Sequence, residues 1–68
     1  MKRFSQDNPI RVLIVDDSSF IRATFKKLLE SDKEIRVVGM ARNGLEAMDL
    51  IRTTKPDLVT LDIEMPVM

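Results

Sequence analysis

Three aspartates stand at the ends of two mostly apolar segments, which is an unusual place for a charged side chain. The pair Asp16-Asp17 follows Ile10–Val15, and Asp62 follows Leu58–Leu61. A carboxylate beside buried strands is costly unless it is paired or bound. If the three acids met, one would be expected to hold its proton unless a cation lay among them. Magnesium suits that position because it prefers oxygen ligands, and a carboxylate beside it could receive a phosphoryl group.

Three strands are expected to carry or support these acids. The segment Arg11–Val15 is a short, nearly continuous apolar run of the kind found in parallel strands buried on both faces. Ile35–Ala41 is a second candidate strand, in which Gly39 marks a weak point or a close approach of another group. Leu58–Leu61 is the third.

A first helix is predicted after the first strand. Asp17, Ser18 and Ser19 are candidate N-cap residues, and the helix should end near residues 31–33. An apolar stripe at helical spacing is expected to face the core. It consists of Phe20, Ile21, Thr24, Phe25, Leu28 and Leu29.

A second helix is predicted after the second strand. Asn43-Gly44 would normally suggest a tight hairpin. The apolar residues that follow recur at helical spacing instead, which favours a helix: Leu45, Met48 and Ile51. Pro56 should end this helix by Lys55.

The alternation of strands and helices predicts a parallel α/β sheet with right-handed crossovers. Functional residues in such sheets gather at the carboxyl ends of strands, where both acidic sites lie. If the first and third strands are neighbours, about 4.8 Å apart, then Asp16 or Asp17 would converge with Asp62. The alternatives are that Asp17 or Ser18 only caps the helix and that the acids are exposed residues without function.

Composition excludes several kinds of function. The 68 residues include no cysteine and no histidine, so a thiolate zinc site and a histidine base or ligand are ruled out within this sequence. Eleven basic and eleven acidic residues balance, which gives no electrostatic case for nucleic acid. The longest apolar run, Val12–Val15, is too short to span a membrane. A cytoplasmic protein is expected.

Three motifs, in this order, resemble the receiver domain of bacterial response regulators (CheY-like). They are Val15–Ser19 (VDDSS), Ala41–Gly44 (ARNG) and Pro56–Pro66 (PDLVTLDIEMP). The resemblance covers residues 10–68 and implies half of a flavodoxin-like, doubly wound parallel sheet with strand order 2-1-3. Residues 1–9 are then a flexible tail. The third motif is most similar to receivers of chemotaxis protein-glutamate methylesterases.

The resemblance also implies roles for individual residues. Asp62 would accept a phosphoryl group from a sensor histidine kinase. Asp17 would bind Mg²⁺ directly and Asp16 largely through water, while the backbone carbonyl of Glu64 would complete the protein ligands. These roles come from the family and not from the spacing alone.

One departure from the family concerns the length of the sequence. Receivers have five strands, whereas this sequence ends after the third, so the family's Ser or Thr on strand four and Lys on strand five have no counterpart. It has no G-x-S-x-G elbow either, so these 68 residues alone are not expected to be an enzyme, although a parent protein could carry an output domain such as a methylesterase.

The alternative function is a non-switching half-receiver that serves in dimerisation or assembly. The third strand would then present an unpaired apolar edge formed by Leu58, Val59, Thr60 and Leu61. Such an edge is a template for pairing with another chain, and self-association through it is expected.

Overall fold

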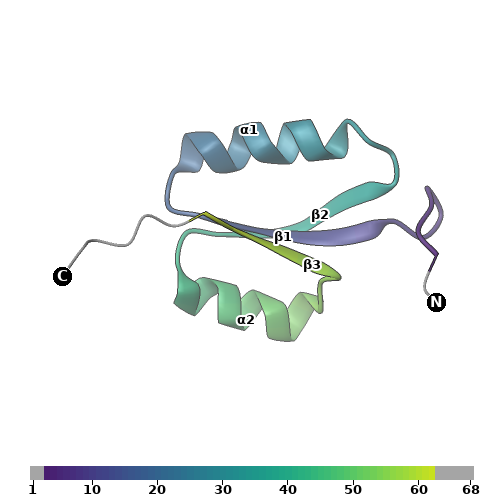
Figure 1. The fold of residues 1–68 in the computed structure, drawn as a ribbon. Helices are drawn as coiled ribbons and strands as arrows, with labels where there is room; N and C mark the ends of the chain where they lie inside the picture. Colours follow the sequence, from purple (N-terminus) through teal and green to yellow (C-terminus); the bar gives the residue numbers. More distant parts are fainter. Residues whose placement is uncertain (1–2, 63–68) are drawn as a thin grey trace.

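The computed structural model describes residues 3–62, apart from the side chain of Asp62 (Figure 1). In chain order the elements are β1 (Ile10–Asp16), α1 (Ser19–Glu30), β2 (Ile35–Ala41), α2 (Gly44–Thr54) and β3 (Leu58–Asp62). The predicted alternation is confirmed, and β1 and β3 each include the aspartate that follows their apolar run. No helix in this part of the chain is long and apolar enough to cross a bilayer.

The three strands form one parallel sheet in the order β2-β1-β3. The predicted order 2-1-3 is therefore confirmed. In Figure 1, α1 and α2 cover opposite faces of this sheet. This follows from right-handed crossovers, because the chain moves to one side of β1 through α1 and to the other side through α2.

The core is built around β1. The four side chains from Val12 to Val15 are at most 2% exposed, because β1 has a strand on each edge and a helix on each face. Leu13 and Val15 form a buried cluster with residues of β2 and α2: Ala41, Ala47 and the partly buried Leu50. Each fully buried aliphatic side chain contributes about 1.5–3 kcal/mol to folding.

Strand β2 contains a β-bulge beside a tight contact. Val12 pairs with Val37 and Leu13 pairs with Gly39, so Val38 is an extra residue on this strand. A Cβ at Gly39 would lie 3.1 Å from Cδ1 of Leu13 and 3.5 Å from Cδ1 of Leu50. The glycine is therefore a point of close approach, which was one of the two predicted roles.

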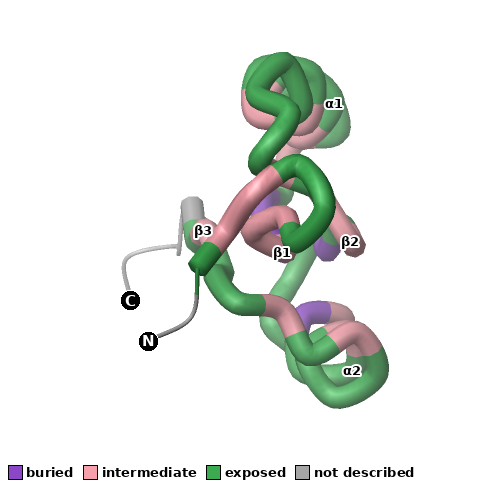
Figure 2. The backbone as a smooth tube through the Cα atoms, turned by 90° about the vertical axis from the view of Figure 1, so that its right-hand side faces the viewer, coloured by how far each residue is buried: buried purple, intermediate pink, exposed green. Residues whose placement is uncertain are grey.

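The prediction that the apolar stripe of α1 is buried is wrong. No residue of α1 is buried, and the side chains of Phe20 and Leu28 are 75% and 66% exposed. The reason is the width of the sheet under the helix. Figure 2 shows α1 over β1 and β2, and within residues 3–62 neither helix contacts β3.

The connection from α2 to β3 is fixed to the start of β1. Lys55 ends α2 in the left-handed conformation (φ 49°), and its N–H donates to the carbonyl of Ile51. Nη1 of Arg11 donates to the Lys55 carbonyl at 3.0 Å. The backbone of Arg11 donates to the Asp57 carboxylate at 2.9 Å and accepts from the Asp57 N–H at 2.7 Å. These bonds fix where β3 begins against β1.

Lys55→Gly is predicted to raise the free energy of unfolding by about 0.5–1 kcal/mol. A residue with a Cβ pays roughly 1–2 kcal/mol in the left-handed region, and the greater freedom of glycine in the unfolded chain offsets part of the gain. Urea unfolding would measure the change. Lys33→Gly is the matched control, since Lys55 is the only non-glycine residue with positive φ in residues 3–62. A decrease for Lys55→Gly would contradict the prediction.

Candidate functional site

Strands β1 and β3 end side by side at the carboxyl edge of the sheet. Their register pairs Val12 with Leu58 and continues without a shift to Asp16 and Asp62. Neighbouring strands lie about 4.8 Å apart, so the backbones of these two acids are direct neighbours. The sheet therefore brings together two of the residues that the sequence singles out.

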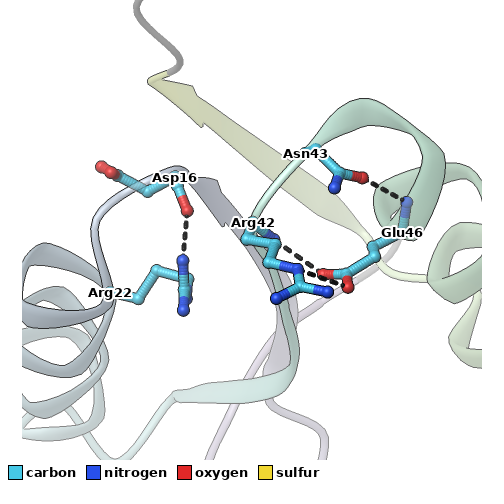
Figure 3. A network of polar contacts seen from close by, with 5 residues as sticks. All are labelled: Asp16, Arg22, Arg42, Asn43 and Glu46. Atoms are coloured by element: carbon cyan, nitrogen blue, oxygen red, sulfur yellow. Dashed lines mark hydrogen bonds and ion pairs between the residues drawn. The ribbon is translucent and has the colours of Figure 1, made fainter.

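Asp16 is a buried acid held by the chain around it. Only 5% of the residue is exposed, and its Oδ1 accepts a hydrogen bond from the backbone N–H of Ser18 at 2.9 Å. Its backbone carbonyl accepts from Nη1 of Arg22 at 2.6 Å (Figure 3). The carboxylate makes no ion pair with any residue in the described part of the chain. It therefore retains lone pairs that a cation or a water could use.

Asp17 lies at the bend between β1 and α1 and is exposed. Of the three N-cap candidates, Ser18 takes that position, because its hydroxyl accepts from the N–H of Ile21 at 3.3 Å. The carboxylate of Asp17 is therefore not used to cap α1. It lies beside the buried Asp16 at the same edge of the sheet.

The predicted ligand set is described only in part. The structure places Asp16, Asp17 and the backbone of Asp62 at one edge, whereas the side chain of Asp62 and all of Glu64 lie outside the described residues. Among residues 3–62 no group of three acidic, histidine or cysteine side chains has a metal-binding arrangement. The donor chemistry nevertheless fits Mg²⁺, since the acids at this edge offer only oxygen ligands.

Arg22 belongs to the site, although it lies outside the apolar stripe of α1 and was not among the predicted site residues. The residue is half-buried, and its guanidinium reaches back to the end of β1 to bond the Asp16 carbonyl. The sequence contains one pattern that could have predicted this role. A basic residue lies one turn after the N-cap of a helix, and that helix begins directly after a strand. A helix of this geometry directs side chains of its first turn back toward its N-terminus.

A second polar network surrounds the N-terminus of α2 (Figure 3). Oδ1 of Asn43 accepts from the N–H of Glu46 at 2.9 Å and caps the helix. The Glu46 carboxylate accepts from the backbone N–H of Arg42 at 3.0 Å and from its Nε at 2.9 Å. The backbone hydrogen bond from Arg42, followed by the charge of that arginine, lowers the pKa of Glu46, and the charge of Arg22 adds to the effect. The i, i+4 spacing of Arg42 and Glu46 could have predicted this pair.

A largely apolar groove of about 260 Å³ lies between α1 and the ends of β1 and β3. Its lining consists of Ile14, Val15, Asp16, Ile21, Phe25, Thr60 and Leu61. The Oγ1 atom of Thr60 is buried and has no hydrogen-bond partner in the described part of the protein. Few polar groups line the groove, so it is better suited to an apolar side chain than to a polar substrate.

Comparisons of this chain with known proteins all indicate the same family. Residues 12–68 match the family described as response regulator receiver domain. A protein-glutamate methylesterase/protein-glutamine glutaminase from Methanospirillum hungatei is 60% identical over 57 residues, which are 84% of this chain and 17% of that protein. The protein of the same name from Bacillus subtilis is 56% identical over 59 residues, 87% of this chain and 16% of that protein. The chain thus spans about a sixth of the length of these relatives.

A solved structure supports the same relationship. The response regulator domain of Thermotoga maritima CheB superposes with a TM-score of 0.80 at 50% sequence identity. The match covers 85% of this chain and 43% of that chain. At this identity the likeness supports the family relationship as well as the fold.

Glu46→Gln is expected to lower the free energy of unfolding at neutral pH. The fold depresses the pKa of Glu46 below its usual value of 4.5. Its stabilisation is therefore present above the unfolded pKa and is lost as the pH falls through the folded pKa. Urea unfolding across the acidic range should show the wild type and the variant converging at the lowest pH.

Glu34→Gln is the control for this prediction, because Glu34 is exposed and its carboxylate has no partner within residues 3–62. A difference between wild type and Glu46→Gln that persisted unchanged at the lowest pH would contradict the electrostatic explanation.

Proposed function

The chain belongs to the response regulator receiver domain family, and we propose that it accepts a phosphoryl group on Asp62 from a histidine kinase in two-component signalling. The observation that carries this proposal is the register of β1 and β3, which sets Asp62 beside the buried Asp16. The exposed Asp17 at the same edge supports it. Functional residues of parallel α/β sheets gather at this carboxyl edge.

In the proposed reaction an oxygen of Asp62 forms a bond to phosphorus while the nitrogen–phosphorus bond of the phosphohistidine breaks. The imidazole nitrogen takes up a proton, and Asp62 becomes an acyl phosphate. Mg²⁺, when bound, would offset the negative charge on the transferred oxygens. Asp17 would hold the ion directly, Asp16 largely through water, and the carbonyl of Glu64 would be a further ligand. Arg22 would act as a positioning residue, because it bonds the carbonyl of Asp16.

The wider setting of the receiver is also a proposal. The relatives named as protein-glutamate methylesterase/protein-glutamine glutaminase are about six times longer than the matched segment. We propose that the receiver controls an output domain such as a protein-glutamate methylesterase. Both would belong to one longer chemotaxis protein of the cytoplasm.

Asp62→Asn is predicted to abolish phosphoryl acceptance. The wild type, incubated with acetyl phosphate and Mg²⁺, should gain one phosphoryl group by intact mass spectrometry, and removal of Mg²⁺ with a chelator should prevent the gain. The amide of the variant is not a competent nucleophile, so no phosphorylated species should form.

Asp49→Asn, an exposed substitution in α2, is the matched control and should be phosphorylated like the wild type. Asp17→Asn should raise the Mg²⁺ concentration needed by roughly tenfold or more. Phosphorylation of Asp62→Asn, or a wild type that takes up no phosphoryl group and binds no beryllofluoride, would overturn the proposal.

A second function, assembly through β3, is favoured by a separate observation. The side chains of Leu58, Val59 and Leu61 are 53%, 38% and 72% exposed. Within the described residues β3 is paired only with β1 and is contacted by neither helix (Figure 2). An open apolar edge of this kind pairs readily with another strand. We propose that the chain self-associates through Leu58, Val59, Thr60 and Leu61.

Val59→Lys is predicted to weaken this association by roughly tenfold or more, equivalent to about 1.4 kcal/mol, because a charge on the edge opposes strand pairing. Light scattering across a concentration series would measure the mass. Met40→Lys, on the other edge strand, is the control and should associate like the wild type. A wild type that stays at the monomer mass of 7.8 kDa at high concentration would contradict assembly.

A further inference from the structure

The dipeptide Asn43-Gly44 joins β2 to α2, and both of its residues are exposed. Gly44 is the first residue of α2. The first N–H groups of a helix have no partner within the helix, and the N–H of Gly44 makes no hydrogen bond to any group in residues 3–62. A backbone nitrogen without a partner therefore lies directly after a side-chain amide.

The fold does not require a glycine at position 44. The φ angle of Gly44 is not positive, so a residue with a Cβ could adopt its backbone conformation. A Cβ placed there would meet no heavy atom within 4 Å apart from its chain neighbours, whereas one at Gly39 would lie 3.1 Å from Cδ1 of Leu13. No other element of the described chain therefore obstructs the approach of the Gly44 nitrogen to the side chain of Asn43.

We propose that Asn43 is a site of spontaneous deamidation. The backbone nitrogen of Gly44 gives up its proton and forms a bond to Cγ of Asn43, while the bond from Cγ to Nδ2 breaks. The departing NH₂ group takes up that proton and leaves as ammonia, and a cyclic succinimide remains. Water then adds to one of the two ring carbonyl carbons, the bond from this carbon to the ring nitrogen breaks, and the nitrogen regains a proton. The products are aspartate and isoaspartate.

Two hydrogen bonds hold Asn43 in the N-cap geometry and oppose this reaction. Its Oδ1 accepts from the N–H of Glu46 at 2.9 Å (Figure 3), and its backbone carbonyl accepts from the N–H of Ala47 at 3.0 Å. An N-cap contributes the equivalent of roughly a tenfold change in equilibrium, or about 1.4 kcal/mol. Because helix ends fray, the folded chain should react more slowly than the unfolded chain by that factor, and not be fully protected.

The sequence contains an internal control, since its two asparagines are Asn8 and Asn43. Asn8 precedes Pro9, whose ring nitrogen carries no hydrogen and cannot form the same succinimide. The side chain of Asn8 is also held, because its Nδ2 donates to the carbonyl of Arg3 at 2.7 Å. Deamidation is therefore expected at Asn43 and not at Asn8.

The two products differ in their effect on α2. Aspartate at position 43 keeps an oxygen that can accept from the N–H of Glu46, and its charge is favourable at a helix N-terminus. Isoaspartate adds a carbon to the main chain between β2 and α2, which would displace Ala47 from its buried cluster with Leu13 and Val15. Either product takes the formal charge of the chain from zero to minus one.

Mass spectrometry of tryptic peptides tests the proposal after the folded chain has been incubated at mildly alkaline pH. Cleavage after Arg42 and Arg52 separates Asn43 from Asn8. The peptide that carries Asn43 should gain the mass difference between an OH and an NH₂ group, and incubation in urea should speed this gain roughly tenfold. The peptide that carries Asn8 should keep its mass.

Gly44→Ala is the matched variant. The added methyl group hinders attack by the backbone nitrogen, so deamidation should slow several-fold. Urea unfolding should show no loss of stability, because the site has room for a Cβ and alanine is the better helix former. A Gly44→Ala variant that reacts as fast as the wild type would overturn the succinimide route. A folded wild type that stays intact while the chain in urea reacts completely would overturn deamidation of the native protein.

Asn43→Asp reproduces the aspartate product and should unfold at about the urea concentration of the wild type. Reacted chain that contains isoaspartate, separated by reversed-phase chromatography and refolded, should unfold at a lower concentration. Equal unfolding of the two forms would overturn the effect assigned to isoaspartate. None of these outcomes depends on phosphoryl acceptance by Asp62.

Discussion

The parallel pairing of β1 with a strand on each of its edges is the interaction on which this small structure depends. It allows four consecutive side chains, Val12 to Val15, to be removed almost completely from water. Outside β1 the only buried apolar residues in the described chain are Ala41 and Ala47. Because each helix covers one face of β1, loss of either neighbouring strand or either helix would expose part of the same buried surface.

The same pairing assembles the carboxyl edge. Asp16 and Asp62 belong to strands far apart in sequence, and only the register of the sheet makes them neighbours. Local contacts then fix the details: the Ser18 N–H holds the carboxylate of Asp16, and Arg22 holds its carbonyl. The site thus combines a long-range constraint, which brings acids together, with short-range hydrogen bonds, which orient one of them.

The sequence predicted those features that depend on periodicity and chain order. The apolar run of β1, the helix after Asn43-Gly44 and the order 2-1-3 are all confirmed. The sequence did not correctly predict the burial of the apolar stripe of α1, because that burial depends on how many strands lie beneath the helix. The helical spacing of Phe20 and Leu28 identifies a face, but it cannot tell whether a strand lies beneath that face.

The sequence also did not predict which groups the longer side chains contact. Arg22 sits at a polar position of α1, yet its guanidinium turns back to the end of β1. The Arg42–Glu46 pair could have been inferred from its spacing. The roles of Asp62 and Glu64 came from family resemblance, and they rest on groups outside the part of the chain that the structure describes.

The one-sided attachment of β3 has a consequence for motion. Its hydrogen bonds within the described chain join it to β1 alone, and no helix holds it in place. Leu58 and Leu61 are already more than half exposed, so the loss of buried surface on detaching β3 falls mainly on β1. Elements of this kind open locally at a free energy below that of global unfolding. Within the described chain, the strand that carries the proposed phosphoryl acceptor is therefore packed against β1 alone, whereas β2 is also packed against both helices.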